Sequence, residues 1–160
     1  MPYTMKTDGL EDVSRMLASL GEKAESVAAQ GLYDGAGEMA DALQKSVDGI
    51  KTEPFRYTVF GQRSPSPEEK AVLGGAIGIA RFSKNGSEVD TSVGFRNAGY
   101  AEIGGKLKPV PMIANAINSG TSFMQKQPFF RKGVSAGSKR AEEAIRSTIE
   151  EKIGEITKDK

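Results

Sequence analysis

Cysteine and histidine, which supply many of the nucleophiles, general bases and metal ligands of enzymes, are both absent from this 160-residue chain. Their absence excludes disulfides, thiol nucleophiles, histidine general bases and zinc sites built on sulfur or imidazole. Carboxylates do occur as adjacent pairs, at Glu68–Glu69, Glu142–Glu143 and Glu150–Glu151. Because neighbouring residues on a helix point about 100° apart, the members of a pair do not converge on one substrate. We interpret all three pairs as solvent-exposed surface.

Two further patterns were considered as ligand sites. The run Gly74–Gly78 is rich in glycine, but it lacks the Gly-x-Gly-x-x-Gly spacing and the strand-to-helix context of a dinucleotide loop. Glu88 and Asp90 would share the exposed face of a strand, yet nothing indicates the roughly six to eight oxygens that calcium prefers. We therefore predict that the protein is not an enzyme and that it holds no cofactor and no metal.

Charge is balanced overall, at net +1, but it is uneven along the chain. Residues 1–60 carry net −4, whereas residues 96–140 carry eight basic side chains and one acid, Glu102, for net +7. Such a segment suits either phosphates or an acidic protein surface. Because a recognition helix and stacking aromatics are not evident, we favour a basic face that pairs with the acidic first helix of the same or a neighbouring chain.

The supply of apolar side chains is thin for a chain of this length. Leu, Ile, Val and Phe number 33 residues, a share only just above the level of about 20% at which disorder becomes common. The low net charge favours a folded protein, and the small core suggests that neighbouring subunits add stability. The longest apolar stretch, residues 71–80, is too short to span a bilayer, and the first thirty residues lack a secretory signal. We expect no membrane association.

The N-terminal part of the chain has helical spacing of its apolar residues. This spacing begins at Leu10 and continues, after a break at Gly21, through residues 24–47. The longer run contains glycines that each cost about 1 kcal/mol relative to alanine in a helix; they are Gly31, Gly35 and Gly37. They are either tolerated weak helix formers or a seam where a helix of another subunit approaches closely, and both interpretations stay open.

The connection at about residues 50–66 is broken by prolines and carries a candidate short strand at 55–59. A connection of this length without regular structure is uncommon in a compact domain, so we expect a flexible or arm-like segment that could reach a neighbouring subunit. Ser66 then has the features of a cap for a helix of about two turns, with Pro67 at its first position and its end at Gly74–Gly75.

Residues 76–95 give the strongest hairpin signal of the chain. Asn85–Gly86 is a favoured turn sequence, and it separates a strand of small residues from one that alternates strictly. One face of the second strand is apolar enough to be buried, whereas the other is polar. The apolar face is formed by Val89, Thr91, Val93 and Phe95.

The C-terminal part is predicted to end in a long amphipathic helix. Residues 96–127 are broken by glycine and proline, with one short helix at 111–117. Pro128 opens the final helix, whose apolar stripe begins at Phe130 and which we expect to be kinked or weakened near Gly133 and Gly137. The whole chain therefore predicts a single α+β domain over residues 1–160: a long N-terminal helix, a central antiparallel sheet built around a hairpin, and a long amphipathic C-terminal helix.

Three segments of the chain occur in a familiar order. The first is Gly9–Val13, leading through residues 17–20 into the alanine-rich helix; the second is the hairpin that ends in Thr91–Phe95. The third is Gly120–Met124 followed by Gln127–Arg131 and the amphipathic helix. This order resembles the neck or tail-component family of long-tailed bacteriophages, the gene-product-ten-like proteins encoded between head-closure and tail-tube genes. The third segment is its most specific part.

The resemblance implies a structural virion protein without catalytic residues. It implies a ring of identical copies, six-fold or twelve-fold, at the head–tail junction or the top of the tail, which completes tail assembly or joins head to tail. Its partners would be head-closure, tail-terminator or tail-tube proteins, and DNA would pass through without specific binding. The protein would be assembled into virions in the bacterial cytoplasm. The alternatives are a tail terminator that caps tube growth and, in another class, a small nucleic-acid-binding protein with a basic patch.

Within this interpretation, the segment from Gly120 to Arg131 positions the last helix against the sheet. Phe129 or Phe130 anchors it, and we favour a role in the core of the subunit over a direct contact between subunits. Helical spacing makes at least Phe130 a core residue. The residues predicted to act in packing or assembly are Gly31, Gly35, Thr121, Pro128, Phe129, Phe130 and Arg131.

Overall fold

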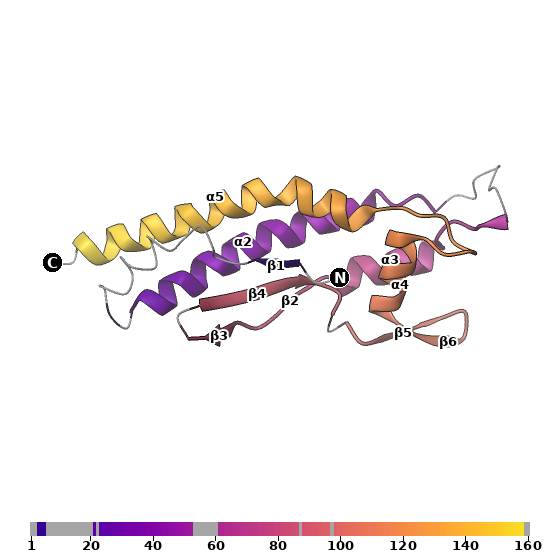
Figure 1. Cartoon of the computed structure of the whole chain (residues 1–160), viewed down its shortest axis with the longest axis horizontal. Coiled ribbons are helices and arrows are strands. Elements are labelled where there is room, and N and C mark those ends of the chain that lie inside the picture. The colour runs from indigo at the N-terminus through magenta and orange to yellow at the C-terminus, as the bar shows by residue number, and fades with distance from the viewer. Residues whose placement is uncertain are drawn as a thin grey trace.

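The fold is dominated by two long helices that lie side by side along the molecule. The computed structural model describes residues 3–5, 21, 23–52, 61–86, 88–96 and 98–158. Helices α2 (Lys23–Asp48) and α5 (Phe129–Lys158) are antiparallel and span most of the long axis (Figure 1). Both confirm helices predicted from apolar spacing. The helix expected from Leu10 and the strand expected at 55–59 lie outside the described residues.

The contact between α2 and α5 is close because glycines lie in it. A Cβ atom at Gly31 would lie 2.9 Å from Ile149 Cγ1, and one at Gly137 would lie 2.7 Å from Ala42 Cβ. Such distances are possible only for glycine, so the two backbones can approach where an alanine would keep them apart. Gly31 and Gly35 of α2 therefore pack against α5 of the same chain, whereas nothing lies within 4 Å of a Cβ built at Gly37.

The second half of that contact involves two glycines of α5. Gly133 and Gly137 were expected to kink or weaken the final helix, and α5 is continuous through both of them. Gly133 faces Leu43, whose Cα would lie 3.1 Å from an added Cβ. Burial against α2 offsets the poor intrinsic helix propensity of glycine, so both positions remain helical and pack against α2.

A small antiparallel sheet packs on α2. Its central strand β4 (Glu88–Gly94) pairs with β1 (Tyr3–Met5) on one side, and with β2 (Gly78–Ile79) and β3 (Ser83–Asn85) on the other. The predicted alternation of β4 is confirmed, because Thr91 and Val93 are buried.

The first strand of the predicted hairpin differs from expectation. It is split into β2 and β3, and the pairing of Asn85 with Glu88 places Gly86, at φ +66°, in the turn while Asn85 ends the strand.

A second hairpin lies where the sequence was expected to be irregular. Strands β5 (Tyr100–Ile103) and β6 (Lys106–Pro109) are joined by Gly104 and Gly105, at φ +59° and +73°. Two consecutive positive φ values are the requirement of a type I′ turn. Strands of four residues are too short for alternation to stand out in a sequence, which is why this hairpin escaped prediction.

Two short helices pack beside this hairpin. The helix α3 (Pro67–Ala76) begins at the predicted Ser66 cap and ends at Ala76, just beyond the expected Gly74–Gly75. The helix α4 (Val110–Ser119) includes the predicted short helix and ends at Gly120. Both lie with β5 and β6 at the end of the molecule opposite the C-terminus (Figure 1).

The core consists of two clusters. One lies between α2, α5 and β4, and the other lies between α3, α4, β5 and the start of α5. Phe129 is 3% exposed and meets Phe95 edge to face, with ring centroids 6.0 Å apart. Phe130, which helical spacing placed in the core, is only partly buried and packs against both clusters. The first residue of α5 is thus the more deeply buried aromatic.

Candidate assembly surface

Four large apolar side chains are exposed on elements that lie at one end of the molecule. Tyr100 is 71% exposed, Leu107 73%, Met112 57% and Phe123 76%. They belong to β5, β6, α4 and the loop after α4, all of which lie at the same end (Figure 1). We call these four residues the apolar end. Contiguous exposed apolar side chains mark protein contacts, and Tyr100 and Leu107 are neighbours of this kind.

The β5–β6 hairpin holds two of these side chains on its outer face. Residues that pair across an antiparallel hairpin share a face, and Tyr100 pairs with Pro109 while Glu102 pairs with Leu107. Tyr100 and Leu107 are therefore diagonal neighbours on one face. Ile103, on the other face, is 7% exposed and belongs to the core. The buried inner face thus fixes the register that projects Tyr100 and Leu107 into solvent.

The loop that carries Phe123 is held by residues 61–66. Arg63 N donates to Phe123 O at 2.8 Å, and Gln125 N donates to Arg63 O at 3.0 Å, which forms a short parallel bridge. Ser64 and Pro65 beside it are buried. This part of the connection expected to be flexible or arm-like is therefore packed on the body of the subunit; residues 53–60 of that connection lie outside the described residues.

Glu69 is the ionic anchor of this end. Both guanidinium NH groups of Arg63 donate to its carboxylate at 2.7 Å, and Lys108 Nζ lies 3.9 Å away. Glu69 also forms a capping box, in which Ser66 N donates to its carboxylate at 2.9 Å while Glu69 N donates to Ser66 Oγ at 3.0 Å. The carboxylate therefore links α3, the 61–66 segment and β6.

This arrangement overturns the interpretation of Glu68–Glu69 as exposed surface. Glu68 is exposed, but the side chain of Glu69 is only 3% exposed. Capping turns it back towards the chain, and two cations compensate its charge. Hydrogen bonding from Arg63 lowers the pKa of Glu69; desolvation opposes this, and Ser66 and Lys108 add to the lowering. The same hydrogen bond raises the pKa of Arg63.

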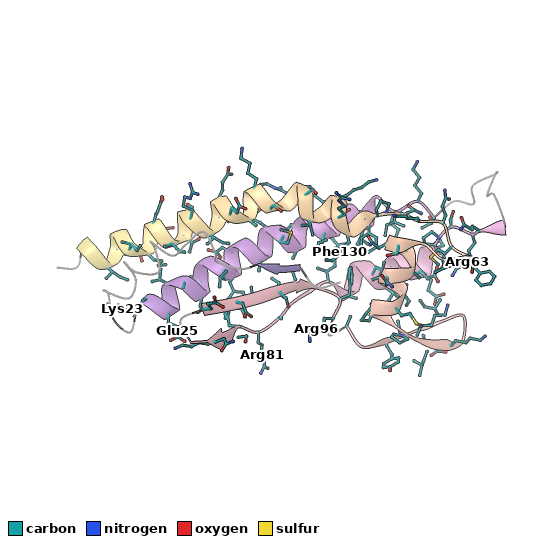
Figure 2. All side chains as sticks on the ribbon, in the orientation of Figure 1. Lys23, Glu25, Arg63, Arg81, Arg96 and Phe130 are labelled. Carbon is teal, nitrogen blue, oxygen red and sulfur yellow. The ribbon has the colours of Figure 1, made fainter. Side chains whose placement is uncertain are left out.

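Charge is segregated along the molecule. One half comprises residues 39–52, 61–80 and 91–140, and includes the apolar end; its described side chains are twelve basic and five acidic. The other half comprises residues 23–38, 81–90 and 141–156, with five basic and ten acidic. Figure 2 shows Arg63 and Glu25 towards opposite ends. The uneven charge of the sequence thus becomes a separation in space.

The basic segment makes little use of acids in its own chain. Among the residues that the structure describes, Arg140 lies 3.9 Å from Glu38, and Lys108 lies 3.9 Å from Glu69. The other six basic side chains of residues 96–140 have no ion-pair partner within the described part of the chain. They are Arg96, Lys106, Lys126, Arg131, Lys132 and Lys139.

The residues singled out from the sequence fall in two places. Gly31 and Gly35 lie in the α2–α5 contact, away from the apolar end. Thr121 supports the loop that presents Phe123, because its Oγ1 accepts from Phe123 N at 3.2 Å and from Met124 N at 3.0 Å.

The other singled-out residues gather where α5 begins. Pro128 precedes that helix, Phe129 is buried, and Phe130 N donates to Asn118 Oδ1 at 3.2 Å. Arg131 is exposed. Together they fix the entry of α5 rather than forming a surface.

The apolar end itself was not predicted. Phe123 belongs to the Gly120–Met124 segment that carries the family resemblance, but no sequence pattern marks Tyr100, Leu107 or Met112 as exposed. The Gly104–Gly105 pair between two short apolar-and-charged runs is the signal that could have located the hairpin and its outer face.

Comparisons with protein-family models, with curated proteins and with solved structures found no match for this chain. Two surface depressions, of about 90 Å³ beside Arg96 and about 170 Å³ beside Lys132, are smaller than the roughly 300 Å³ at which ligand pockets begin. In the described residues, no group of three or more acidic side chains could hold a metal ion. No helix in that part of the chain is both long and apolar enough to cross a membrane.

Proposed function

We propose that this protein is a structural subunit of a bacteriophage neck or tail, which assembles with copies of itself at the head–tail junction or the top of the tail. There it completes tail assembly or joins head to tail. The observation that carries the proposal is the apolar end: four large side chains, each more than half exposed, on elements that the core and Glu69 hold in place. Aromatic residues and methionine are enriched in the cores of protein interfaces.

The arrangement suits a building block for physical reasons. The paired helices α2 and α5 share a core of their own along the molecule. The hairpin and the loop extend contact groups at one end of the molecule. The order of segments that resembles the phage family supports the viral setting. In that setting the subunit forms a six-fold or twelve-fold ring, contacts head-closure, tail-terminator or tail-tube proteins, catalyses nothing, and lets DNA pass.

Deletion of the gene from a phage that encodes this chain tests the proposal. We expect filled heads and separate tails in electron micrographs, and restoration of joined particles by the wild-type gene supplied in trans. A doubly substituted chain, Leu107→Asp with Phe123→Asp, should fail to restore them, whereas the exposed control Lys45→Ala should succeed. Joined and infectious particles from the deletion strain would contradict the proposal. Tails of abnormal length would instead indicate a terminator that caps tube growth.

A second candidate is a nucleic-acid-binding protein, and the six basic side chains that have no ion-pair partner in the described part of the chain favour it. Such a protein would bind DNA at low salt, and its affinity would fall steeply as salt is added. Absence of retention on a DNA column at low ionic strength would remove this candidate.

A further inference from the structure

We infer that the apolar end of one copy docks on the acidic half of α5, residues 141–156, in a second copy. The inference rests on the proposed role as an assembly subunit, and it names the partner and the surface. The contact joins two different surfaces, so each copy can engage one neighbour with its apolar end and another with its α5.

The exposed face of α5 supplies the charge that such a partner needs. Its first turns carry exposed basic side chains, and its second half carries exposed acids. The basic residues of the first turns are Arg131, Lys132, Lys139 and Arg140. The second half carries the acids Glu142, Glu143, Glu150, Glu151 and Glu155 against two basic residues, Arg146 and Lys152, of which Lys152 pairs with Glu155 at 2.9 Å. Positive charge in the first turn opposes the helix macrodipole. Helix stability therefore does not account for this order, whereas an external partner would.

The elements that carry the apolar end have more basic than acidic exposed side chains. Lys106 lies at the tip of the β5–β6 hairpin and Lys126 follows the loop of Phe123; both are exposed and have no ion-pair partner among the described residues. Glu102, which pairs with Leu107 on the outer face, is an exposed acid beside them. Two apolar ends that met face to face would bring two surfaces of net positive charge together, and two acidic halves would bring together two surfaces of net negative charge. Repulsion of this kind disfavours a symmetric pairing, while opposite charges favour docking of the apolar end on the acidic half.

The positions of the two surfaces determine what the contact can build. In Figure 1, α5 runs along one side of the molecule with its acidic half towards the C-terminus, and the β5–β6 hairpin lies on the other side at the opposite end. One copy can therefore use both surfaces at once. Repetition of a contact between unlike surfaces gives a ring if the rotation closes and a filament if it does not.

Two complementary variants test the contact in the full chain. The first, Leu107→Asp, introduces a charge into the apolar end and leaves α5 intact. The second, Glu150→Lys with Glu151→Lys, reverses charge on α5 and leaves the apolar end intact. By sedimentation velocity at low salt, we expect wild-type protein to form oligomers and each variant alone to associate at least about tenfold more weakly.

The equimolar mixture of the two variants is the decisive sample. Only one productive pair of surfaces remains in it, so we expect 1:1 heterodimers and nothing larger. The control Arg81→Glu changes an exposed basic residue in the acidic half of the molecule, and it should assemble as wild type does. Circular dichroism checks that each variant is folded, and Phe123→Ser, in a different element, provides a second disruption of the apolar end.

Several outcomes would overturn the inference. These are wild-type protein that stays monomeric, single variants that assemble as well as wild type, or a mixture that remains monomeric although wild type assembles. None of these outcomes contradicts the proposed function if the deletion strain still yields unjoined heads and tails. Oligomers with the expected behaviour, together with a deletion strain that makes normal particles, would keep the contact and reject the role.

Discussion

Single glycines decide how closely α2 and α5 approach. An alanine Cβ at Gly35 would lie 2.9 Å from the carbonyl oxygen of Ala141 and would also meet the side chain of Ile145. At Gly37, two residues along the same helix, nothing lies within 4 Å of that position. Substituting alanine for each of these two glycines therefore distinguishes the effect of steric fit from that of helix propensity within one helix.

We expect Gly35→Ala to lower the free energy of unfolding by about 1–3 kcal/mol, because overpacking outweighs the gain in helix propensity. Gly37→Ala should raise it by up to about 1 kcal/mol, since only the propensity changes. Urea denaturation followed by circular dichroism measures both. Equal effects of the two substitutions would show that the close approach of the helices contributes nothing.

The carboxylate of Glu69 should make stability depend on pH. Its pKa is lowered in the folded protein, chiefly by the hydrogen bonds from Arg63. A group of this kind adds stability above its unfolded pKa, and the contribution is lost as the pH falls through the folded value. We expect this part of the free energy of unfolding to disappear below roughly pH 4, the ordinary range of glutamate.

The substitution Glu69→Gln keeps the size of the side chain and removes its charge. It should lower the free energy of unfolding at pH 7 by about 1–2 kcal/mol, because hydrogen bonds to a charged group are lost and the half-exposed Arg63 limits the effect. It should also flatten the stability profile below pH 5. The exposed neighbour Glu68→Gln should change little, and an identical loss in both variants would refute the role of the buried anchor.

At the scale of elements, the β5–β6 turn controls the apolar end. Gly105 has φ +73°, a conformation that a β-branched residue adopts only with strain. We expect Gly105→Val to destabilise the hairpin by about 1–2 kcal/mol and to speed amide hydrogen exchange in β5 and β6. Gly104→Asn should be tolerated, because asparagine suits the first position of this turn. Unchanged exchange in the valine variant would contradict the assigned turn.

Substitutions at the start of α5 and in the loop before it should distinguish residues that stabilise the subunit from residues that act in association. Phe129→Ala removes a buried ring and should lower the free energy of unfolding by about 3–5 kcal/mol. Phe123→Ala removes a ring that is 76% exposed, so it should leave stability within about 0.5 kcal/mol and weaken only association. Thermal unfolding and sedimentation of the two variants provide the test. A large loss of stability in Phe123→Ala would show that its ring is part of the core.

At the scale of the whole molecule, charge separation makes association sensitive to salt. Most charges of the basic half and of the acidic half are exposed, and the inferred contact brings the basic half of one copy to the acidic half of another. Screening over about 8 Å at physiological ionic strength weakens such contacts. We expect the oligomer fraction to fall between 50 mM and 500 mM sodium chloride, while the midpoint of thermal unfolding of monomers stays nearly constant. Association that grows with salt would indicate a contact dominated by apolar burial.

The amino-acid sequence by itself determined the helices and the main turn. The bounds of α2, α3, α4 and α5 follow from apolar spacing, the Ser66 cap and terminal glycine, all of which act over a few residues. All the residues that make up such a local signal lie close together in the sequence, so the signal can be recognised without the tertiary structure. The α+β order of elements follows from these local signals: along the chain, a long helix comes before the antiparallel sheet and another long helix comes after it.

Only the tertiary structure decided which surfaces meet. Apolar spacing shows which face of α2 is buried, but not that Ile145 and Ile149 of the same chain cover Gly31 and Gly35. A capping pattern predicts the turn at Glu69, but not the arrival of Lys108 from a strand thirty-nine residues away. The hairpin that exposes Tyr100 and Leu107 is likewise held by segments distant in the sequence, which bury its inner face. Contacts between distant segments depend on how every element packs at once, and the sequence specifies them only through the folded chain.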